Sequence, residues 1–398
     1  MSRVKSSGDL DPTHELAPPN DSEFAMLRQV ILALAVTSQF SPTVSDQKAS
    51  LNPDQRIAHY TEVIRLDPKN VLAFSERGIA WLLKRDYDRA IADFTETIRL
   101  DPKNDSAYGN RGNAWNSKQQ YDKALADYSE SIRLNPKSVR AYGNRGDSWL
   151  EQREYDKAIA DFSESIRLDP KDAWSYCNRG NAWHGKQNED KALADYTSAI
   201  RADPKFAKAY VNRGNIWKIK EDSEKAIADY NIAIQLNPTS ANAYINRGSV
   251  WQEKEDHDRA IADFTIAIRL DPKQQSAFSL RGDSWRLKNE YEKAISDLTE
   301  AIRLDPEDFW PYFNRADARH SKQEYDGTIA DYTVAIRLNP KEAWSYIGRG
   351  GAWMAKREFD KAIADYDKAI RLDPANADAI DARAEAIREK KLAERKAP

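Results

Sequence analysis

The stretch RGNAWNSKQQYDKALADYSESIRLNP, residues 111–136, returns 34 residues later as RGDSWLEQREYDKAIADFSESIRLDP, residues 145–170. The same pattern continues along the chain at an unchanged step, and its closing proline recurs at positions 68, 102, 136, 170, 204, 238, 272, 306, 340 and 374. A fixed internal period of this length indicates an array of small supersecondary units rather than one globular core. Nine full repeats occupy residues 71–376, and positions 1–34 are numbered within each repeat.

Aromatic and small residues within each repeat follow helical spacing. Position 4 is aromatic in all nine repeats, position 8 is Gly in eight, position 11 is Trp in eight and position 20 is Ala in eight. Steps of three and four residues predict two amphipathic helices per repeat. Proline at position 32 ends the second helix because it lacks an N–H and clashes with the preceding turn. Gly and Ala at positions 8 and 20 predict a close approach of the two helices, and Trp at position 11 fills the space between neighbouring repeats.

Composition excludes several classes of function. The chain has 398 residues, of which 61 are basic and 64 acidic, so it lacks the basic surplus of a nucleic-acid-binding protein. A single cysteine, Cys177, excludes a disulfide framework and a cysteine-based zinc site. The five histidines are scattered, and no phosphate-binding loop or nucleophile motif is present. We therefore expect no catalytic residues, no cofactor, no metal, no nucleic-acid partner and no membrane-spanning helix.

The repeat pattern resembles the tetratricopeptide repeat (TPR) family, whose units are also 34 residues of paired helices. The resemblance implies an all-α fold, a right-handed superhelical solenoid of antiparallel helix pairs. It also implies a concave groove lined by positions 2, 5, 6, 9, 12 and 13 of the first helices. The function implied is a non-enzymatic protein–protein interaction scaffold that binds extended polypeptide segments in this groove. Two alternatives are a self-associating structural protein that forms homo-oligomers and a substrate-recruiting subunit of a separate enzyme.

One feature departs from the usual family pattern. Position 7, commonly leucine in the family, is Arg in all nine repeats, and position 23 is Asp in all nine. Because each of these two positions keeps a single residue type, of opposite charge, we predict an Arg–Asp pair between the two helices of each repeat. Such pairs contribute to register more reliably than to stability. The alternative is an arginine ladder for phosphorylated ligands, which is disfavoured because each Arg is accompanied by its own carboxylate.

Asparagine at position 6 is the first candidate for ligand binding. It occurs in six repeats, as Asn110, Asn144, Asn178, Asn212, Asn246 and Asn314. An Asn amide both donates and accepts hydrogen bonds, so a row of them suits the backbone of an extended peptide. The row is similar to the asparagine ladder in the TPR superhelix of O-GlcNAc transferase, which grips substrate backbone. The alternative is that these side chains are solvated and idle.

Three tryptophans outside position 11 are the second candidate. Trp174, Trp310 and Trp344 all occupy position 2, near the edge of the predicted groove. Exposed tryptophans are favoured interface anchors, although position 2 can equally pack against the previous repeat. Repeat eight, residues 309–342, is the most divergent and combines Arg319 in place of Trp with an aromatic start.

The ends of the chain depart from the repeat pattern. Residues 1–23 form a polar leader that we expect to be disordered. Residues 24–40 hold an apolar segment with two interpretations. It resembles a signal peptide, which implies export to the periplasm or beyond. Alternatively, it forms a capping helix in a cytoplasmic protein. Residues 41–70 contain a degenerate partial repeat. Residues 377–398 are predicted to form a C-terminal capping helix and tail, with Ile380, Ala384 and Ile387 facing inward.

Overall fold

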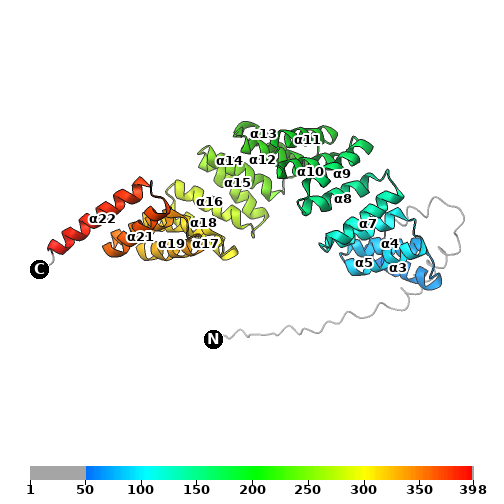
Figure 1. Ribbon diagram of the computed structural model, residues 1–398, viewed down its shortest axis with the longest axis horizontal. Coiled ribbons are helices and arrows are strands. Elements are labelled where there is room, and N and C mark those ends of the chain that lie inside the picture. The colour runs from blue at the N-terminus through cyan, green and yellow to red at the C-terminus, as the bar shows by residue number, and fades with distance from the viewer. Residues whose placement is uncertain (1–50, 397–398) are drawn as a thin grey trace, which may run out of the picture. The chain divides into compact units, whose positions relative to one another are not determined.

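The computed structural model describes residues 51–396, and the predictions for residues 1–23 and 24–40 lie outside that range. The chain divides into two compact bodies, the N-terminal body Met1–Ser148 and the C-terminal body Trp149–Pro398, and each is described by itself. The described residues form twenty helices and no strand (Figure 1). The predicted all-α fold is therefore confirmed.

Helices alternate between the two kinds predicted from the repeat. The first helices of repeats one to nine are α4 (Val71–Leu83), α6 (Asp105–Ser117), α8 (Val139–Glu151), α10 (Ala173–Gly185), α12 (Ala207–Ile219), α14 (Ala241–Glu253), α16 (Gln275–Leu287), α18 (Phe309–Ser321) and α20 (Ala343–Ala355). The second helices are α5 (Tyr87–Leu100), α7 (Tyr121–Leu134), α9 (Tyr155–Leu168), α11 (Glu189–Ala202), α13 (Ser223–Leu236), α15 (His257–Leu270), α17 (Tyr291–Leu304), α19 (Tyr325–Leu338) and α21 (Phe359–Leu372). α3 (Pro53–Leu66) precedes them and α22 (Ala377–Lys396) follows. In the N-terminal body α3 to α7 pack on one another in chain order, and in the C-terminal body α9 to α22 do so, as a solenoid requires.

The turn inside each repeat has a left-handed residue at position 15. All nine of these residues have φ near +60°, and none is glycine: Arg85, Gln119, Arg153, Gln187, Glu221, Glu255, Asn289, Gln323 and Arg357. The next backbone N–H donates back to the carbonyl of position 11, as Asp86 does to Trp81 at 2.9 Å. This is the hydrogen bond of a Schellman cap, which ends the first helix and starts the turn. The second helix ends two residues before the position-32 proline, as predicted.

Glycine at position 8 allows the aromatic ring of position 24 to lie against the first helix. A Cβ added at Gly214 would come 2.7 Å from Cε1 of Tyr230, and one added at Gly248 would come equally close to Phe264. Both rings are fully buried. The small residue therefore serves the close helix approach predicted from the sequence, and the ring of the second helix is what occupies the space.

The predicted Arg–Asp pair forms within each body. In eight repeats the Arg at position 7 donates from Nε and Nη2 to the two oxygens of the Asp at position 23, at 2.6–2.9 Å. In repeat three the corresponding residues, Arg145 and Asp161, belong to different bodies. In repeat five the side chain of Asp229 is 6% exposed and that of Arg213 is 20% exposed. A bidentate geometry satisfies both buried carboxylate oxygens.

The same arginine also reaches the preceding repeat. Its Nη1 donates to the side-chain oxygen at position 25 of the previous second helix in all nine repeats, at 2.5–3.2 Å. Its guanidinium also lies over the position-4 ring, as Arg213 does over Tyr210 at 5.7 Å. One side chain therefore joins both helices of its own repeat to the previous repeat.

The interior of the last helix differs from the prediction. Ile380 is 45% exposed, Ala384 is also exposed and Ile387 is half-buried, whereas Ala379 and Ala386 are fully buried. The predicted inward face was therefore wrong. Ile380, Ala384 and Ile387 occupy positions 4, 8 and 11, which in the full repeats face a second helix of the same repeat. Among the described residues no such helix follows α22, so these positions remain uncovered.

The Arg–Asp pair generates a stability prediction. Arg213→Leu leaves the buried Asp229 carboxylate without its cation and lowers local stability by about 3 kcal/mol. We expect hydrogen exchange in α12 and α13 to accelerate about a hundredfold, while α20 and α21 serve as the internal reference. The double variant Arg213→Leu/Asp229→Ala removes the unpaired charge and recovers at least half of the loss. Equal exchange in the single and double variants would contradict this account.

Candidate functional site

The six asparagines at position 6 do not share one environment. Asn110 and Asn178 are buried, at 8% and 3% exposure, which leaves little surface for a ligand. Asn144, Asn212, Asn246 and Asn314 are half-buried. Asn110 and Asn144 belong to the N-terminal body and the other four to the C-terminal body. The predicted row is thus divided between two bodies and between two degrees of burial.

Three of these asparagines take part in a hydrogen-bond network between repeats. Nδ2 of Asn144, Asn212 and Asn246 donates to Oδ1 of the position-9 Asn of the previous repeat, at 2.7–2.9 Å. The same Oδ1 accepts from the hydroxyl of the position-24 tyrosine in its own repeat, at 2.7–2.9 Å. We call this arrangement the Tyr–Asn–Asn network. Its members are Tyr128, Asn113 and Asn144, then Tyr196, Asn181 and Asn212, then Tyr230, Asn215 and Asn246.

Sequence reasoning missed this network, although the sequence carries a signal for it. Position 24 is Tyr in repeats two, four and five, where position 9 is Asn. It is Phe in repeats one, three and six, where position 9 is Ile, Asp or Ser. A buried tyrosine hydroxyl needs a partner, and phenylalanine does not. The paired change at two positions 15 residues apart therefore marks the contact.

The position-2 tryptophans lie at the surface of the C-terminal body. Trp310 and Trp344 are 57% and 49% exposed and begin α18 and α20, which pack on one another. Trp174 is 36% exposed and its ring makes an edge contact of 5.8 Å with the buried Phe162. The first two therefore present more free surface than the third.

Trp310 belongs to an aromatic cluster in repeat eight. Its ring lies 5.1 Å from that of Phe309 and 6.0 Å from that of Phe313, measured between centroids. Phe313 in turn contacts Tyr332 edge-on at 5.6 Å. Aromatic contacts therefore connect an exposed tryptophan to the buried side of α19.

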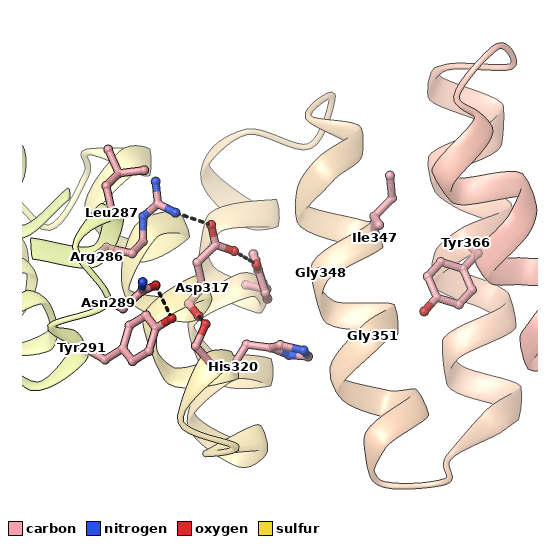
Figure 2. A pocket seen from close by; sticks show the side chains of 12 residues that line it. Arg286, Leu287, Asn289, Tyr291, Asp317, His320, Ile347, Gly348, Gly351 and Tyr366 are labelled. Carbon is pink, nitrogen blue, oxygen red and sulfur yellow. Dashed lines mark hydrogen bonds and ion pairs between the residues drawn. The ribbon is translucent and has the colours of Figure 1, made fainter. Parts of the chain in front are cut away.

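An open cavity of about 480 Å³ lies beside this cluster, among repeats seven, eight and nine. Its walls come chiefly from positions 5, 6, 9, 12 and 13 of α16, α18 and α20, the positions assigned to the groove by the family resemblance. Its polar lining includes Arg286, Asp317 and His320 (Figure 2). Tyr332 on α19 also lines it. The opposite wall on α20 carries Gly348 and Gly351 (Figure 2).

Asp317 is the central polar group of this cavity. Its Oδ1 accepts a short hydrogen bond from the Tyr332 hydroxyl, and Nη1 of Arg286 lies 3.7 Å from its Oδ2. Burial raises the pKa of this carboxyl, while the Tyr332 hydroxyl and the Arg286 charge act in the opposite direction. The same burial raises the pKa of Tyr332.

Repeat nine lacks side chains at two positions that border the cavity. Positions 6 and 9 of α20 are Gly348 and Gly351, whereas repeats two, four and five have Asn at both. Tyr366 at position 24 therefore has no side chain at position 9 to accept a hydrogen bond from its hydroxyl, and the hydroxyl makes no hydrogen bond within the described range. The sequence analysis singled out repeat eight as divergent, but it missed the glycines of repeat nine.

A second cavity of about 390 Å³ follows from the other substitutions in repeat eight. Elsewhere Lys or Arg at position 19 stacks over the position-11 tryptophan, as Lys225 does over Trp217 at 4.4 Å. Repeat eight has Arg319 and Gly327 at these positions, and Arg319 turns to Asp331 at 2.7 Å. The loss of the stacked pair opens the surface there.

Comparison with family models identifies the repeats. Models described as tetratricopeptide repeat or TPR repeat match residues 49–105, 117–173, 207–240, 241–274, 282–323 and 343–376. The chain belongs to the tetratricopeptide repeat family. No curated protein matches it at a significant level.

Solved TPR structures are similar in fold. The Cut9 and Hcn1 complex of the APC/C matches with a TM-score of 0.52 and 14% identity, over 84% of this chain and 83% of the other. YrrB, described as a TPR protein with an unusual peptide-binding site, matches with a TM-score of 0.43 and 24% identity, over 48% and 97%. A TPR protein from Parabacteroides merdae matches with a TM-score of 0.46 and 20% identity, over 63% and 99%. The TPR repeats support a protein–protein interaction scaffold, as TPR proteins generally are.

The described residues carry no features of a membrane span or a metal site, and their one cysteine is buried. Within 51–396 no helix has the length and apolar content to cross a bilayer. The same part of the chain holds no group of three or more metal-ligating side chains. Cys177 is fully buried, and burial raises the pKa of its thiol to about 11, so it stays protonated at neutral pH.

The Tyr–Asn–Asn network generates the second prediction. Asn215→Ala leaves the buried Tyr230 hydroxyl without an acceptor and the Asn246 amide without its partner. We expect a loss of about 2 kcal/mol in urea denaturation followed by circular dichroism. The control is Ser249→Ala at the same position of repeat six, where the hydroxyl donates only to the Ile245 carbonyl of its own helix. Its cost should stay within about 0.5 kcal/mol, and equal losses for both variants would argue against the network.

Proposed function

We propose that this TPR protein is a non-enzymatic scaffold that binds an extended polypeptide segment on the first-helix face of its C-terminal body. The observation that supports this most is the cavity among repeats seven to nine together with Trp310 and Trp344. A pocket of this volume falls within the range of about 300–1,000 Å³ typical of ligand sites. Apolar anchors beside a polar cavity are the usual composition of an interface hot spot.

The two tryptophans serve as anchors in this proposal. Both are among the most exposed large apolar side chains of the described chain, yet they occupy the same position of adjacent first helices. Trp344 and the cavity residues Ile347 and Gly348 lie three and four residues apart on α20, so they share a helix face. A peptide that crosses α18 and α20 would contact both tryptophans and the cavity.

The asparagines take a secondary part. The amide nitrogens of Asn212 and Asn246 donate to the previous repeat, and their Oδ1 atoms accept no hydrogen bond within residues 51–396. Those oxygens remain to accept peptide N–H groups. In the N-terminal body Asn144 is placed in the same way. Asn314 is half-buried on α18 three residues before Asp317, which places it at the edge of the cavity face.

The third prediction tests the anchors. Peptides selected by the full-length protein from a displayed random library should lose about tenfold or more in affinity for Trp310→Ala and for Trp344→Ala, measured by calorimetry. The control is Ile232→Ala, which removes an exposed apolar side chain from the second helix α13. It should leave affinity unchanged.

Two outcomes would contradict the proposal. Selection that yields no peptide above background would remove peptide binding as a function. Selected peptides that bind both tryptophan variants as tightly as wild type would move the site away from α18 and α20. Light scattering on the free protein provides a separate comparison, since an oligomer that grows with concentration would favour self-association instead.

A further inference from the structure

Repeats eight and nine carry an incomplete copy of the Tyr–Asn–Asn network. In the complete copies an acceptor at position 9 receives two donors, the tyrosine hydroxyl of its own repeat and the Asn amide at position 6 of the next. Repeat eight keeps the tyrosine and an acceptor, Tyr332 and Asp317. Repeat nine has Gly348 where the donating asparagine should be. The outer end of the Tyr332 ring occupies the position that a Cβ at Gly348 would take, and the cavity lies beside it, bordered by the backbone of Gly348 and Gly351.

The acceptor remains available to a ligand. Oδ1 of Asp317 is used by Tyr332, and its Oδ2 has only Arg286 Nη1 at 3.7 Å, which is too long for a hydrogen bond. Arg286 instead donates from Nε and Nη2 to Asp283, at 3.0 and 2.7 Å. Oδ2 of Asp317 therefore receives no hydrogen bond from the residues described.

A second polar atom at the same place also lacks a partner. His320 follows Asp317 by three residues on α18 and extends toward Gly351 on α20 (Figure 2). Its Nδ1 is buried and makes no hydrogen bond in the part of the chain described. Because this nitrogen has almost no accessible surface, a ligand in the cavity does not reach it. The cavity thus offers an acceptor at Asp317 and, beside it, Nη1 of Arg286, which makes no hydrogen bond with the residues described.

Charge decides which ligand chemistry fits. A basic side chain at Asp317 would lie close to the guanidinium of Arg286. An acidic side chain would face the carboxylates of Asp317 and, behind Arg286, of Asp283. A purely apolar side chain would desolvate Asp317 and Arg286 without giving either a hydrogen bond, which is costly. A neutral group that both donates and accepts satisfies both and adds no charge.

We propose that the cavity binds a carboxamide side chain, glutamine or asparagine, of the extended peptide, which supplies the amide donor that repeat nine lacks. The ligand amide N–H donates to Oδ2 of Asp317, and the ligand carbonyl accepts from Nη1 of Arg286, so the carboxamide bridges the two groups. Trp310 and Trp344 then contact the residues on either side of it. The inference rests on the proposed function and names the residue type that the peptide must carry.

The peptide side of the test uses the full-length chain and a displayed library of random peptides. Selected sequences should be enriched in Gln or Asn at one fixed position. Replacing that residue by Glu, Lys or Met, which have similar length, should each weaken binding about tenfold or more in calorimetry. Enrichment of acidic residues would instead make Arg286 an anion site, and enrichment of basic residues would make Asp317 a cation site. Either result overturns the carboxamide proposal.

The protein side of the test supplies the missing group internally. Gly348→Asn should complete the network, weaken the selected peptide about tenfold or more and slow hydrogen exchange in α18 and α20. A Cβ at Gly348 would overlap the outer end of the Tyr332 ring, which therefore has to move. The pairs Tyr196 with Asn212 and Tyr230 with Asn246 show that the repeat accommodates both side chains. Glu76→Asn, at the same position of repeat one, is the matched control and should leave affinity unchanged.

Two variants of Asp317 separate hydrogen bonding from charge. Asp317→Asn retains an acceptor oxygen and should keep affinity for the Gln peptide within about threefold, whereas Asp317→Ala should lose about tenfold or more. Failure to select any peptide would refute the proposed function and this inference together. Peptides that lose affinity in the tryptophan variants, yet show no Gln or Asn preference and bind Gly348→Asn normally, would refute this inference alone.

Discussion

The arginine at position 7 is the group on which the repeat array depends. In repeat five, Arg213 uses all three guanidinium nitrogens, two for Asp229 of its own second helix and one for Thr197 of the previous repeat. The carboxylate is buried and already desolvated, so it has no water to replace the guanidinium. In the eight repeats where the Arg–Asp pair forms within one body, the same side chain therefore fixes the repeat internally and to its predecessor. With this spacing fixed, an asparagine at position 6 reaches the acceptor at position 9 of the previous repeat.

A regular array makes its exceptions informative. Where the acceptor at position 9 is Asn, the next repeat supplies an Asn donor, and the polar groups between repeats are satisfied. Between repeats eight and nine the donor is absent, and an acceptor and an open cavity coincide. The aromatic cluster around Trp310 and the glycines Gly348 and Gly351 lie on the first helices of these two adjacent repeats.

Much of this structure could be predicted from the sequence, because a period repeated nine times averages out local ambiguity. The helix pairs, the close contact at position 8 and the pairing of Arg213 with Asp229 all follow from residue types fixed at each position. The inward face of α22 could not be derived in this way, since Ile380 occupies a position that packs only when a second helix follows. The cavity also escaped prediction because it is bordered by positions without side chains, Gly348 and Gly351. An absence has meaning only once the contacts of its neighbours are known.

The two glycines of α20 require an explanation beyond sterics. Each costs a helix interior roughly 1 kcal/mol relative to alanine, and Gly348 also forgoes the hydrogen bond that Asn212 and Asn246 make in their repeats. The ring of Tyr332 lies against Gly348. In other repeats a tyrosine at the same position coexists with an asparagine. The close contact is therefore a result of the glycine and does not by itself require a glycine at this position. Local rules are broken most often where a protein binds something. Other repeats of the array place their own asparagine carboxamide next to the acceptor at position 9. Repeat nine does not, and it leaves an open cavity beside Asp317. This arrangement suits a carboxamide supplied by another chain.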